Sequence, residues 1–456
     1  MSSDVTISSY HFPELRSALF TWAAGAAAAA KAANSGNGLG LSELISAQVS
    51  AIYALAEWDN VRRVVESDDQ LRRQIGHAVG SVLWTQTVEL ENIGAPFLNA
   101  MLLDKERTGT GYELDTVLFD SLYGPIDVFL GRDYIEYEGV APLVGLDCEN
   151  APIELGDDIS IELLGEQHRA TTNLELSLLR IAYSQLRPSG GELAIPRHYR
   201  HGVVWRFSLP KIVDGEDSEE ATRIYLETVR LRDCCIRAIA AAQTIAVIPW
   251  PPTILEVGWR TQLSVTLGGP QMIWRLDEPG AILSDGHKEA LLRAWKHVSS
   301  ARFDEENASI SLALARLGGL GTRLTIEDRF LDVMIAYEAF FSPPGSHVEL
   351  KFRLASHAAV IGDETLPEWG RRVIYDFMAK AYDVRSTIVH GDKPSRRDLR
   401  YAGRDVNLAE FVVYASEVVR SSIDWAFKKW KPGENIAIAW NDLLFGKSIS
   451  LGDPEE

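Results

Sequence analysis

The sequence has few cysteines and no long apolar run, and these absences exclude several classes of protein. Only three of the 456 residues are cysteine, which is too few for a disulfide framework, and the adjacent pair Cys234 and Cys235 does not have the spacing of a zinc site. No stretch of eighteen strongly apolar residues is present, and the first residues lack the basic start of a signal peptide. We therefore expect a cytoplasmic protein without a membrane span.

Motifs for binding phosphate loops or metal ions are also missing. The run 108–111 contains glycines but lacks the Lys-Ser/Thr pair and the preceding strand of a phosphate loop. The histidines have no acidic or cysteine partners at ligand spacing, so we predict neither a metal site nor a cofactor. A metallohydrolase or a nucleotide-binding enzyme in the first 280 residues is therefore disfavoured.

Positive charge is scarce, and its distribution along the chain is uneven. The net charge of −19 argues against nucleic-acid binding by the whole surface. Residues 281–456 carry 23 Lys and Arg against 26 Asp and Glu, a net charge of −3, whereas the first 280 residues account for the other −16. The acidity therefore lies mostly outside the C-terminal part of the chain.

The apolar pattern predicts an α+β protein with several domains. Residues 1–110 have mainly helical spacing, residues 111–280 contain short strand-like runs between Gly, Pro and Asp, and residues 281–456 return to helical spacing. We interpret these parts as a helical N-terminal region, a mixed β-rich module and an all-α C-terminal bundle. In the middle module we expect strands at residues 128–130, 134–137, 159–163, 203–207 and 263–267 and one helix at 218–243.

The most distinctive segment is 382–391, at the end of a predicted long helix. Apolar residues recur at three- and four-residue steps before and through it, and Arg385 lies in their stripe. Such an arginine needs a partner or a wet cleft, because an isolated buried charge is costly. His390 follows at the helix end, before Gly391, a residue suited to a left-handed cap. In an unbroken helix the two side chains point about 140° apart, so they meet only if the helix frays or tightens there.

Three segments of the C-terminal part resemble the HEPN superfamily, specifically its Apea-like branch. These are residues 328–341, residues 349–353 and residues 382–391, which carry an Arg-x4-His signature. The resemblance covers about residues 280–430. It implies a helical bundle that forms homodimers and, in many members, cleaves RNA without a metal ion. Many catalytic members carry Asn, Asp or His directly after the arginine, whereas this chain has Ser386.

Glu338 lies among apolar residues of a predicted helix, and a carboxylate in that position needs a partner. We expect it to meet Arg385 or His390 from a neighbouring helix. The contact is either a buried ion pair that fixes the register of the helices or a contact that orients Arg385 or tunes His390, and the two roles are compatible. Tyr382, one turn before Arg385, either packs or assists through its hydroxyl. Ser386 follows Arg385 directly as a second supporting residue.

Basic residues cluster directly after this motif. We expect their loop to follow the phosphate backbone of RNA through Lys393, Arg396, Arg397 and Arg400. Beyond the loop, residues 406–430 are predicted to form a long helix. Its apolar face either packs within the chain or forms the seam of a dimer.

Arg385 and His390 suit the cleavage of RNA by transesterification. RNA carries its own nucleophile, the 2′-hydroxyl, so the reaction needs a base, an acid and a cation rather than a metal ion. His390 serves as base or acid because an imidazole titrates near neutral pH, and Arg385 binds the nonbridging phosphate oxygens. One such pair has too few proton-transfer groups for efficient cleavage. The resemblance implies that a homodimer brings two pairs together across a two-fold axis.

These observations favour a metal-independent endoribonuclease of the HEPN type that acts on RNA. Its N-terminal modules would respond to a trigger or a partner protein, and the resemblance to Apea-like proteins points to prokaryotic defence against phages. The alternative is a catalytically inactive HEPN domain that acts as an RNA-binding, regulatory or scaffolding dimer. Ser386 and the overall negative charge favour this alternative.

Overall fold

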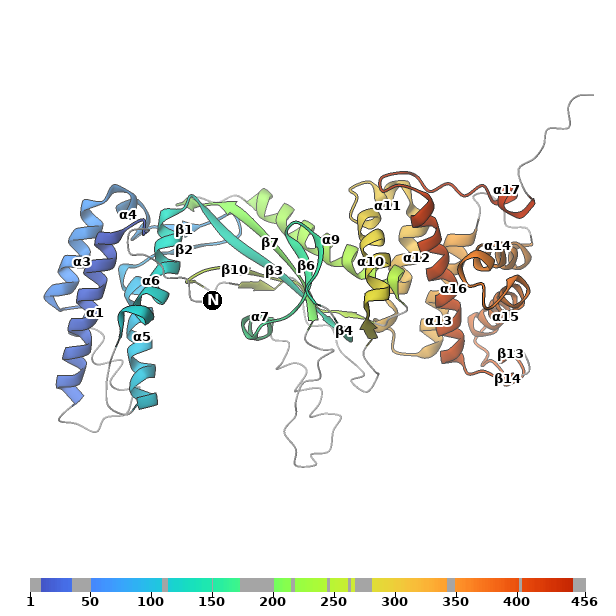
Figure 1. Ribbon diagram of the computed structural model, residues 1–456, viewed down its shortest axis with the longest axis horizontal. Helices are drawn as coiled ribbons and strands as arrows, with labels where there is room; N and C mark the ends of the chain where they lie inside the picture. The colour runs from blue at the N-terminus through green and yellow to red at the C-terminus, as the bar shows by residue number, and fades with distance from the viewer. Residues whose placement is uncertain are drawn as a thin grey trace, which may run out of the picture. The chain divides into compact units, whose positions relative to one another are not determined.

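The structure is a computed structural model with mixed α/β architecture and a helical C-terminal region (Figure 1). The predicted fold class is confirmed at this level, and the assignment of the C-terminal part to a HEPN bundle stays a prediction. The structure describes residues 10–34, 51–108, 114–149, 151–172, 201–214, 218–243, 247–260, 264–266, 281–342, 349–401 and 404–445.

The chain divides into two compact units, each assembled from separate stretches of sequence. The first contains Met1–Glu138, Arg206–Tyr225 and Ile254–Val265, and the second contains Gly139–Trp205, Leu226–Thr253 and Thr266–Glu456. This division differs from the three consecutive domains 1–110, 111–280 and 281–456 expected from the sequence. The reason is that the strands β3 (Tyr134–Val144) and β7 (His201–Pro210) each contribute residues to both units.

The helices of the first unit pack around aromatic side chains. The ring of Trp58 lies 4.5 Å from that of Trp22 and 4.7 Å from that of Tyr53. Both tryptophans are fully buried. The helices are α1 (Pro13–Asn34), α3 (Ala56–Ser67), α4 (Asp69–Gln74), α5 (Leu90–Thr108) and α6 (Thr116–Gly131).

Residues 128–130, which the sequence predicts as a strand, are part of the last turn of α6. A short apolar run fits a strand and a buried helix equally well by periodicity alone. The carboxylate of Asp127 in α6 is buried and accepts hydrogen bonds from the peptide N–H groups of His11 and Phe12, both at 2.8 Å. Together with Asp115, which caps the first turn, this long-range contact favours the helix.

Short strands complete the first unit. The antiparallel order is β2-β1-β8. The first two strands lie within residues 1–110, where the sequence predicts mainly helix, and each has only three residues, so periodicity gives little signal for them. The bounds are Ala78–Gly80 for β1, Thr85–Thr87 for β2 and Ile212–Val213 for β8.

The largest sheet has the strand order β11-β10-β3-β7-β6-β5, with β9 paired to β3. It confirms the strands predicted at residues 134–137, 159–163 and 203–207. Of the strand predicted at 263–267, residues 264–266 are observed and the two end residues lie outside the described part of the chain. The remaining bounds are Ile153–Gly156 for β5, Ile159–Leu163 for β6, Ile248–Pro249 for β9, Thr253–Glu256 for β10 and Ser264–Thr266 for β11.

Two helices and a parallel strand pair accompany this sheet. The predicted helix at 218–243 is confirmed as α9 (Ser218–Ala242), and a short helix, α7, spans Glu166–Thr171. The pair consists of β4 (Leu146–Cys148) and β12 (Ala281–Leu283).

The C-terminal helices form a bundle around α16 (Leu408–Lys429), which packs against α10, α13, α14 and α15. The long helix predicted at 406–430 is therefore confirmed. Its apolar face is mostly buried inside the chain, so that face packs within the protein, and Val413 and Tyr414 remain exposed. The other elements are α10 (Asp285–Val298), α11 (Phe303–Glu306), α12 (Ala308–Gly318), η3 (Leu320–Thr322), α13 (Ile326–Phe341), α14 (Leu350–Thr365), α15 (Arg371–Val389), β13 (Arg400–Tyr401), β14 (Arg404–Asp405) and α17 (Trp440–Phe445).

Two buried histidines link the stability of this bundle to pH. His297 donates a hydrogen bond to the carbonyl of Phe427 at 3.2 Å and stacks on its ring at 4.4 Å. His357 donates to the carbonyl of Phe341 at 2.8 Å and stacks on Trp440 at 4.2 Å. Burial lowers the pKa of both imidazoles below the ordinary 6.5.

We expect the bundle to lose stability as the pH falls from about 7 to about 5. Between the lowered pKa values and 6.5 the unfolded chain binds more protons than the folded chain, so the free energy of unfolding decreases with falling pH in that window. Urea unfolding at several pH values measures this. A variant with His297→Phe and His357→Phe should lose part of the dependence, and an unchanged slope in the variant would contradict the assignment.

Candidate functional site

The site predicted from the sequence lies at the C-terminal end of α15. The helix ends at Val389, His390 is its C-cap, and Gly391 has a φ of +85°. The predicted long helix and its left-handed glycine cap are therefore both confirmed. Arg385 lies at the edge of the buried face of α15 rather than within it, because its side chain is 28% exposed.

The opposite wall of the site comes from α13. Thr325 begins this helix, and its hydroxyl accepts the peptide N–H of Asp328 at 3.1 Å. Glu338 lies three turns further along and is half-buried. The position of this carboxylate therefore depends on how α13 packs against α15.

Glu338 and Arg385 form the contact that the sequence predicts. The Nη2 atom of Arg385 lies 3.2 Å from Oε1 and 3.3 Å from Oε2 of Glu338, and only the contact to Oε2 has hydrogen-bond geometry. The guanidinium also lies over the ring of Tyr382, 5.6 Å from its centre. Burial raises the pKa of Glu338, and the charge of Arg385 acts against this rise. The arginine is thus held by a carboxylate and a ring while part of it stays in contact with solvent.

The side chain of His390 does not take part in the contact between Glu338 and Arg385. Its peptide N–H donates to the carbonyl of Ser386 at 3.1 Å, so the helical phase continues to the cap. Its side chain is exposed, and within the described residues it has neither a hydrogen bond nor an ion pair. Within one chain, therefore, no hydrogen bond joins the side chains of Arg385 and His390. The alternative in which Glu338 meets His390 is not observed.

A buried tyrosine that the sequence reading missed lies behind this pair. Tyr337 is fully buried, and its hydroxyl has no hydrogen-bond partner among the described residues. Burial raises its pKa well above the ordinary value, and the nearby Glu338, Tyr382 and Tyr375 add to the effect. The only sequence signal for it is its place next to Glu338. Several polar side chains of α13 and α15 thus gather in one region between the helices.

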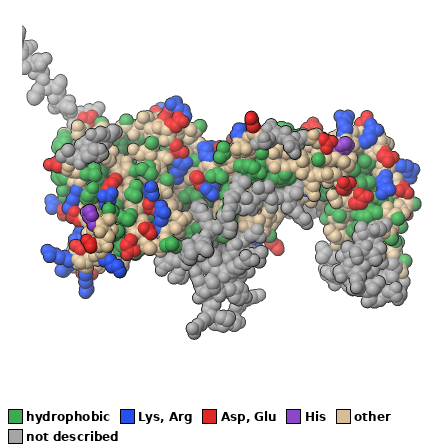
Figure 2. Space-filling model, turned by 180° about the vertical axis from the view of Figure 1, so that it is seen from behind, with side chains coloured by type: hydrophobic (Ala, Val, Ile, Leu, Met, Phe, Trp, Pro, Cys, Tyr) green, Lys and Arg blue, Asp and Glu red, His purple; other side chains and the backbone are tan. Residues whose placement is uncertain are grey.

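The loop after α15 presents the basic side chains predicted to contact RNA. Figure 2 shows Lys and Arg side chains at the end of the C-terminal bundle that carries β13 and β14. Arg396 is paired with Asp405, and Ser386 is exposed on the adjoining helix. The exposed basic residues of the loop are Lys393, Arg396, Arg397 and Arg400.

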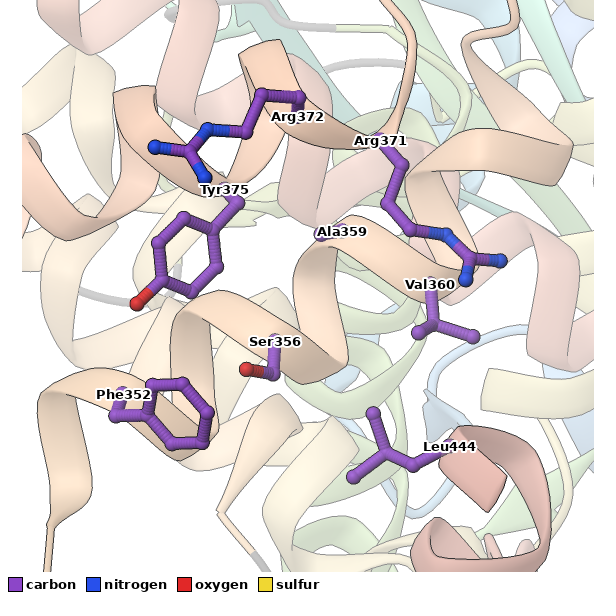
Figure 3. A pocket seen from close by; sticks show the side chains of 8 residues that line it. All are labelled: Phe352, Ser356, Ala359, Val360, Arg371, Arg372, Tyr375 and Leu444. Carbon is purple, nitrogen blue, oxygen red and sulfur yellow. The ribbon is translucent and has the colours of Figure 1, made fainter.

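A cavity of about 510 Å³ lies between α14, α15 and α17 (Figure 3). Its charged lining residues are Arg371 and Arg372, and Phe352 and Tyr375 form an aromatic part of the wall. The sequence gives these arginines no feature that distinguishes them from a solvated helix face. Only the packing of the helices groups them with the two rings.

The described residues hold no group of three or more His, Cys, Asp or Glu side chains that could bind a metal ion. None of the helices in the described ranges is both long enough and apolar enough to cross a membrane. Comparisons with protein-family models, with curated proteins and with solved structures gave no match for this chain. Membership of the HEPN superfamily therefore stays a prediction from the three sequence segments.

Proposed function

We propose that this protein is a metal-independent endoribonuclease of the HEPN type, with its catalytic site at the end of α15. The observation that supports the proposal is the placement of Arg385. Both of its contacts with Glu338 use Nη2, and the side chain is 28% exposed, so other N–H groups of the guanidinium can bind phosphate oxygens. Glu338 acts as the residue that positions this guanidinium.

His390 supplies proton transfer in the proposed reaction. The 2′-oxygen attacks phosphorus and loses its proton to one imidazole, the bond to the 5′-oxygen breaks, and a second imidazole gives that oxygen a proton. The products are a 2′,3′-cyclic phosphate and a 5′-hydroxyl. Arg385 stabilises the charge that develops on the nonbridging oxygens of the phosphorane.

A homodimer completes the proposed site. Within one chain the His390 side chain has no hydrogen bond to Arg385, and the helix keeps its phase up to the cap. A two-fold axis near the ends of two α15 helices would place each imidazole beside the phosphate held by the other chain. The exposed loop with Arg396, Arg397 and Arg400 would follow the RNA backbone. The suggested role in defence against phages rests on the sequence resemblance.

Cleavage of RNA in the presence of a chelator tests this proposal. Pure protein incubated with end-labelled single-stranded RNA should give the same products in EDTA as in magnesium, and the products should carry 2′,3′-cyclic phosphate ends. Treatment with acid followed by phosphatase identifies these ends. An absolute requirement for a divalent ion would exclude the mechanism.

The second candidate is a catalytically inactive HEPN bundle that binds RNA or a partner protein as a dimer. The absence of a hydrogen bond between the side chains of Arg385 and His390, and the serine at position 386, favour it. In that case the protein should retard labelled RNA in a gel shift and leave it intact, both alone and with a cell extract that contains a trigger. Light scattering on the same sample determines whether the protein is dimeric.

A further inference from the structure

One lysine of the first unit points toward the interior rather than into solvent. Lys211 follows directly after β7, in which Phe207 and Leu209 alternate with exposed residues, and it continues their inner face. The residue is half-buried. Its Nζ atom donates hydrogen bonds to the carbonyl of Phe129 in α6 and to Oε1 of Gln74 in α4, the latter at 3.1 Å. The amine is therefore held between a strand end and two helices.

Both hydrogen-bond partners of this amine are neutral. Within the described part of the chain Lys211 forms no ion pair, whereas Lys351, for example, is paired with Asp383 at 2.6 Å. An ammonium group has three N–H donors, and a neutral amine has two N–H groups and a lone pair. The two neutral acceptors can bind both N–H groups of the neutral amine, and its lone pair then points in a third direction.

The charged groups around the amine do not reverse the effect of its burial. Burial lowers the pKa of Lys211 to about 8. Asp133 and Glu256 oppose this decrease, and Arg260 adds to it. Lys211 and Arg260 lie over the same ring, that of Phe129, with Nζ at 4.7 Å and the guanidinium carbon at 4.3 Å from its centre. A lysine that is desolvated beside another cation has the features of an activated nucleophile.

We propose that Lys211 is an acylation site, at which the amine takes a small acyl group from an acyl phosphate or an acyl thioester. The lone pair of Nζ forms a bond to the acyl carbon, and the bond from that carbon to the phosphate oxygen or the thioester sulfur breaks. The leaving group keeps the bonding electrons, and one proton of the amine passes to water. The product is a neutral amide, so acylation removes a charge that burial disfavours and leaves no carboxylate without its partner.

The alternative role of this amine is structural. Phe129 lies in the last turn of α6, where carbonyl groups have no partner within the helix, and a lysine can cap them. A lysine that only caps the helix would be shielded and would react more slowly than an exposed lysine. The rate of acylation therefore distinguishes the two roles.

Acetyl phosphate and acetyl coenzyme A are the two probes, since they present the same acyl group on different leaving groups. The full chain is incubated with each, and peptide mass spectrometry over time gives the initial rate at each lysine. Lys393 is the internal reference, because it is exposed and forms no ion pair among the described residues. At about pH 7.5 we expect Lys211 to react at least about tenfold faster than Lys393, because a larger share of its amine is neutral.

Two glutamine variants test whether the neutral partner matters. Gln74 and Gln70 both donate to the carbonyl of Leu130, at 2.9 Å and 3.3 Å, and of the two Gln74 has the hydrogen bond to Lys211. Gln74→Glu gives the amine a carboxylate partner, which favours the ammonium form, so acylation of Lys211 should slow by about tenfold or more. Gln70→Glu is the control and should leave the rate unchanged. Thermal unfolding verifies that each variant folds, and the comparison of Lys211 with Lys393 decides if Gln74→Glu does not.

The proposal is supported if Lys211 exceeds Lys393 by this margin with one donor or with both, and if Gln74→Glu removes the advantage. A preference for one donor identifies the acyl phosphate or the thioester as the source. The proposal is overturned if Lys211 does not exceed Lys393 by this margin with either donor, which would leave only the capping role, or if folded Gln74→Glu reacts at the natural rate. The site uses no residue of α13 or α15, so RNA cleavage by Arg385 and His390 is tested separately.

Discussion

Replacement of His390 by alanine is expected to abolish RNA cleavage without changing the thermal unfolding of the protein. The side chain is exposed and has no polar partner within the described residues, so its loss removes no contact that stabilises the fold. In the proposed reaction it transfers a proton, a contribution of about 10²–10⁴ in rate for each group, and a dimer loses both groups at once. Initial rates on labelled RNA measure the effect.

The control for this variant is His77→Ala. His77 is also an exposed histidine. It contacts Asp214, and neither residue belongs to the helices that carry the proposed site. This control should cleave RNA at the natural rate. If His390→Ala cleaved as fast as the control, His390 would not be the proton-transfer group and the proposed site would be wrong.

The variant Arg385→Lys separates two roles of the arginine, which are pairing with Glu338 and binding two phosphate oxygens. Lysine keeps the positive charge and a partner for Glu338, and it lacks the planar fork that binds two phosphate oxygens. We expect a large loss of cleavage with a small change in stability, whereas Arg385→Ala should also destabilise the bundle because it leaves the half-buried Glu338 unpaired. Cleavage at the natural rate by Arg385→Lys would show that a point charge is sufficient.

The largest loss of stability is expected for Arg260→Ala, at about 3–5 kcal/mol. Arg260 and Glu256 are both buried and form two hydrogen bonds, each of 2.7 Å. Arg260 also donates to the carbonyl of Val79 at 2.8 Å and lies over the ring of Phe129 at 4.3 Å. The variant leaves the carboxylate buried without its cation, which costs far more than the loss of an exposed pair. Urea unfolding measures the difference.

Arg132→Ala is the matched control for this prediction. Arg132 and Glu136 have the same i,i+4 spacing, but their side chains are 34% and 49% exposed, so we expect a loss of about 1 kcal/mol or less. A variant with Glu256→Leu and Arg260→Met should recover much of the stability, because it removes both charges together. Equal losses in the free energy of unfolding for Arg260→Ala and Arg132→Ala would contradict the prediction that burial decides the cost of removing the arginine.

Local sequence rules predicted the elements on which the candidate site is built. The helix before Gly391 follows from apolar spacing and from the preference of glycine for positive φ. The pairing of Glu338 with Arg385 follows from a simpler rule, since charges placed among apolar residues need partners. That rule left Arg385 and His390 as the two candidate partners of Glu338. Only the packing of α13 against α15 decided that the partner is Arg385.

Apolar periodicity was insufficient to predict the structure where a segment was short or where the segment it packs against was distant in sequence. Residues 128–130 are helical, because the buried carboxylate of Asp127 binds two peptide N–H groups more than a hundred residues away. The division into two units also depends on long strands whose residues are shared between the units, and no composition change marks that arrangement.

The sequence by itself determined the helical C-terminal part, the end of α15 and the need of Glu338 for a cation, because these depend on spacing and on the cost of burying charge. The tertiary structure alone decided that Glu338 pairs with Arg385 while His390 stays in solvent, and that two arginines and two rings line one cavity. The direction of a side chain depends on the phase of its helix, and a cavity depends on the packing of neighbouring helices. Neither is encoded by the residues of one segment.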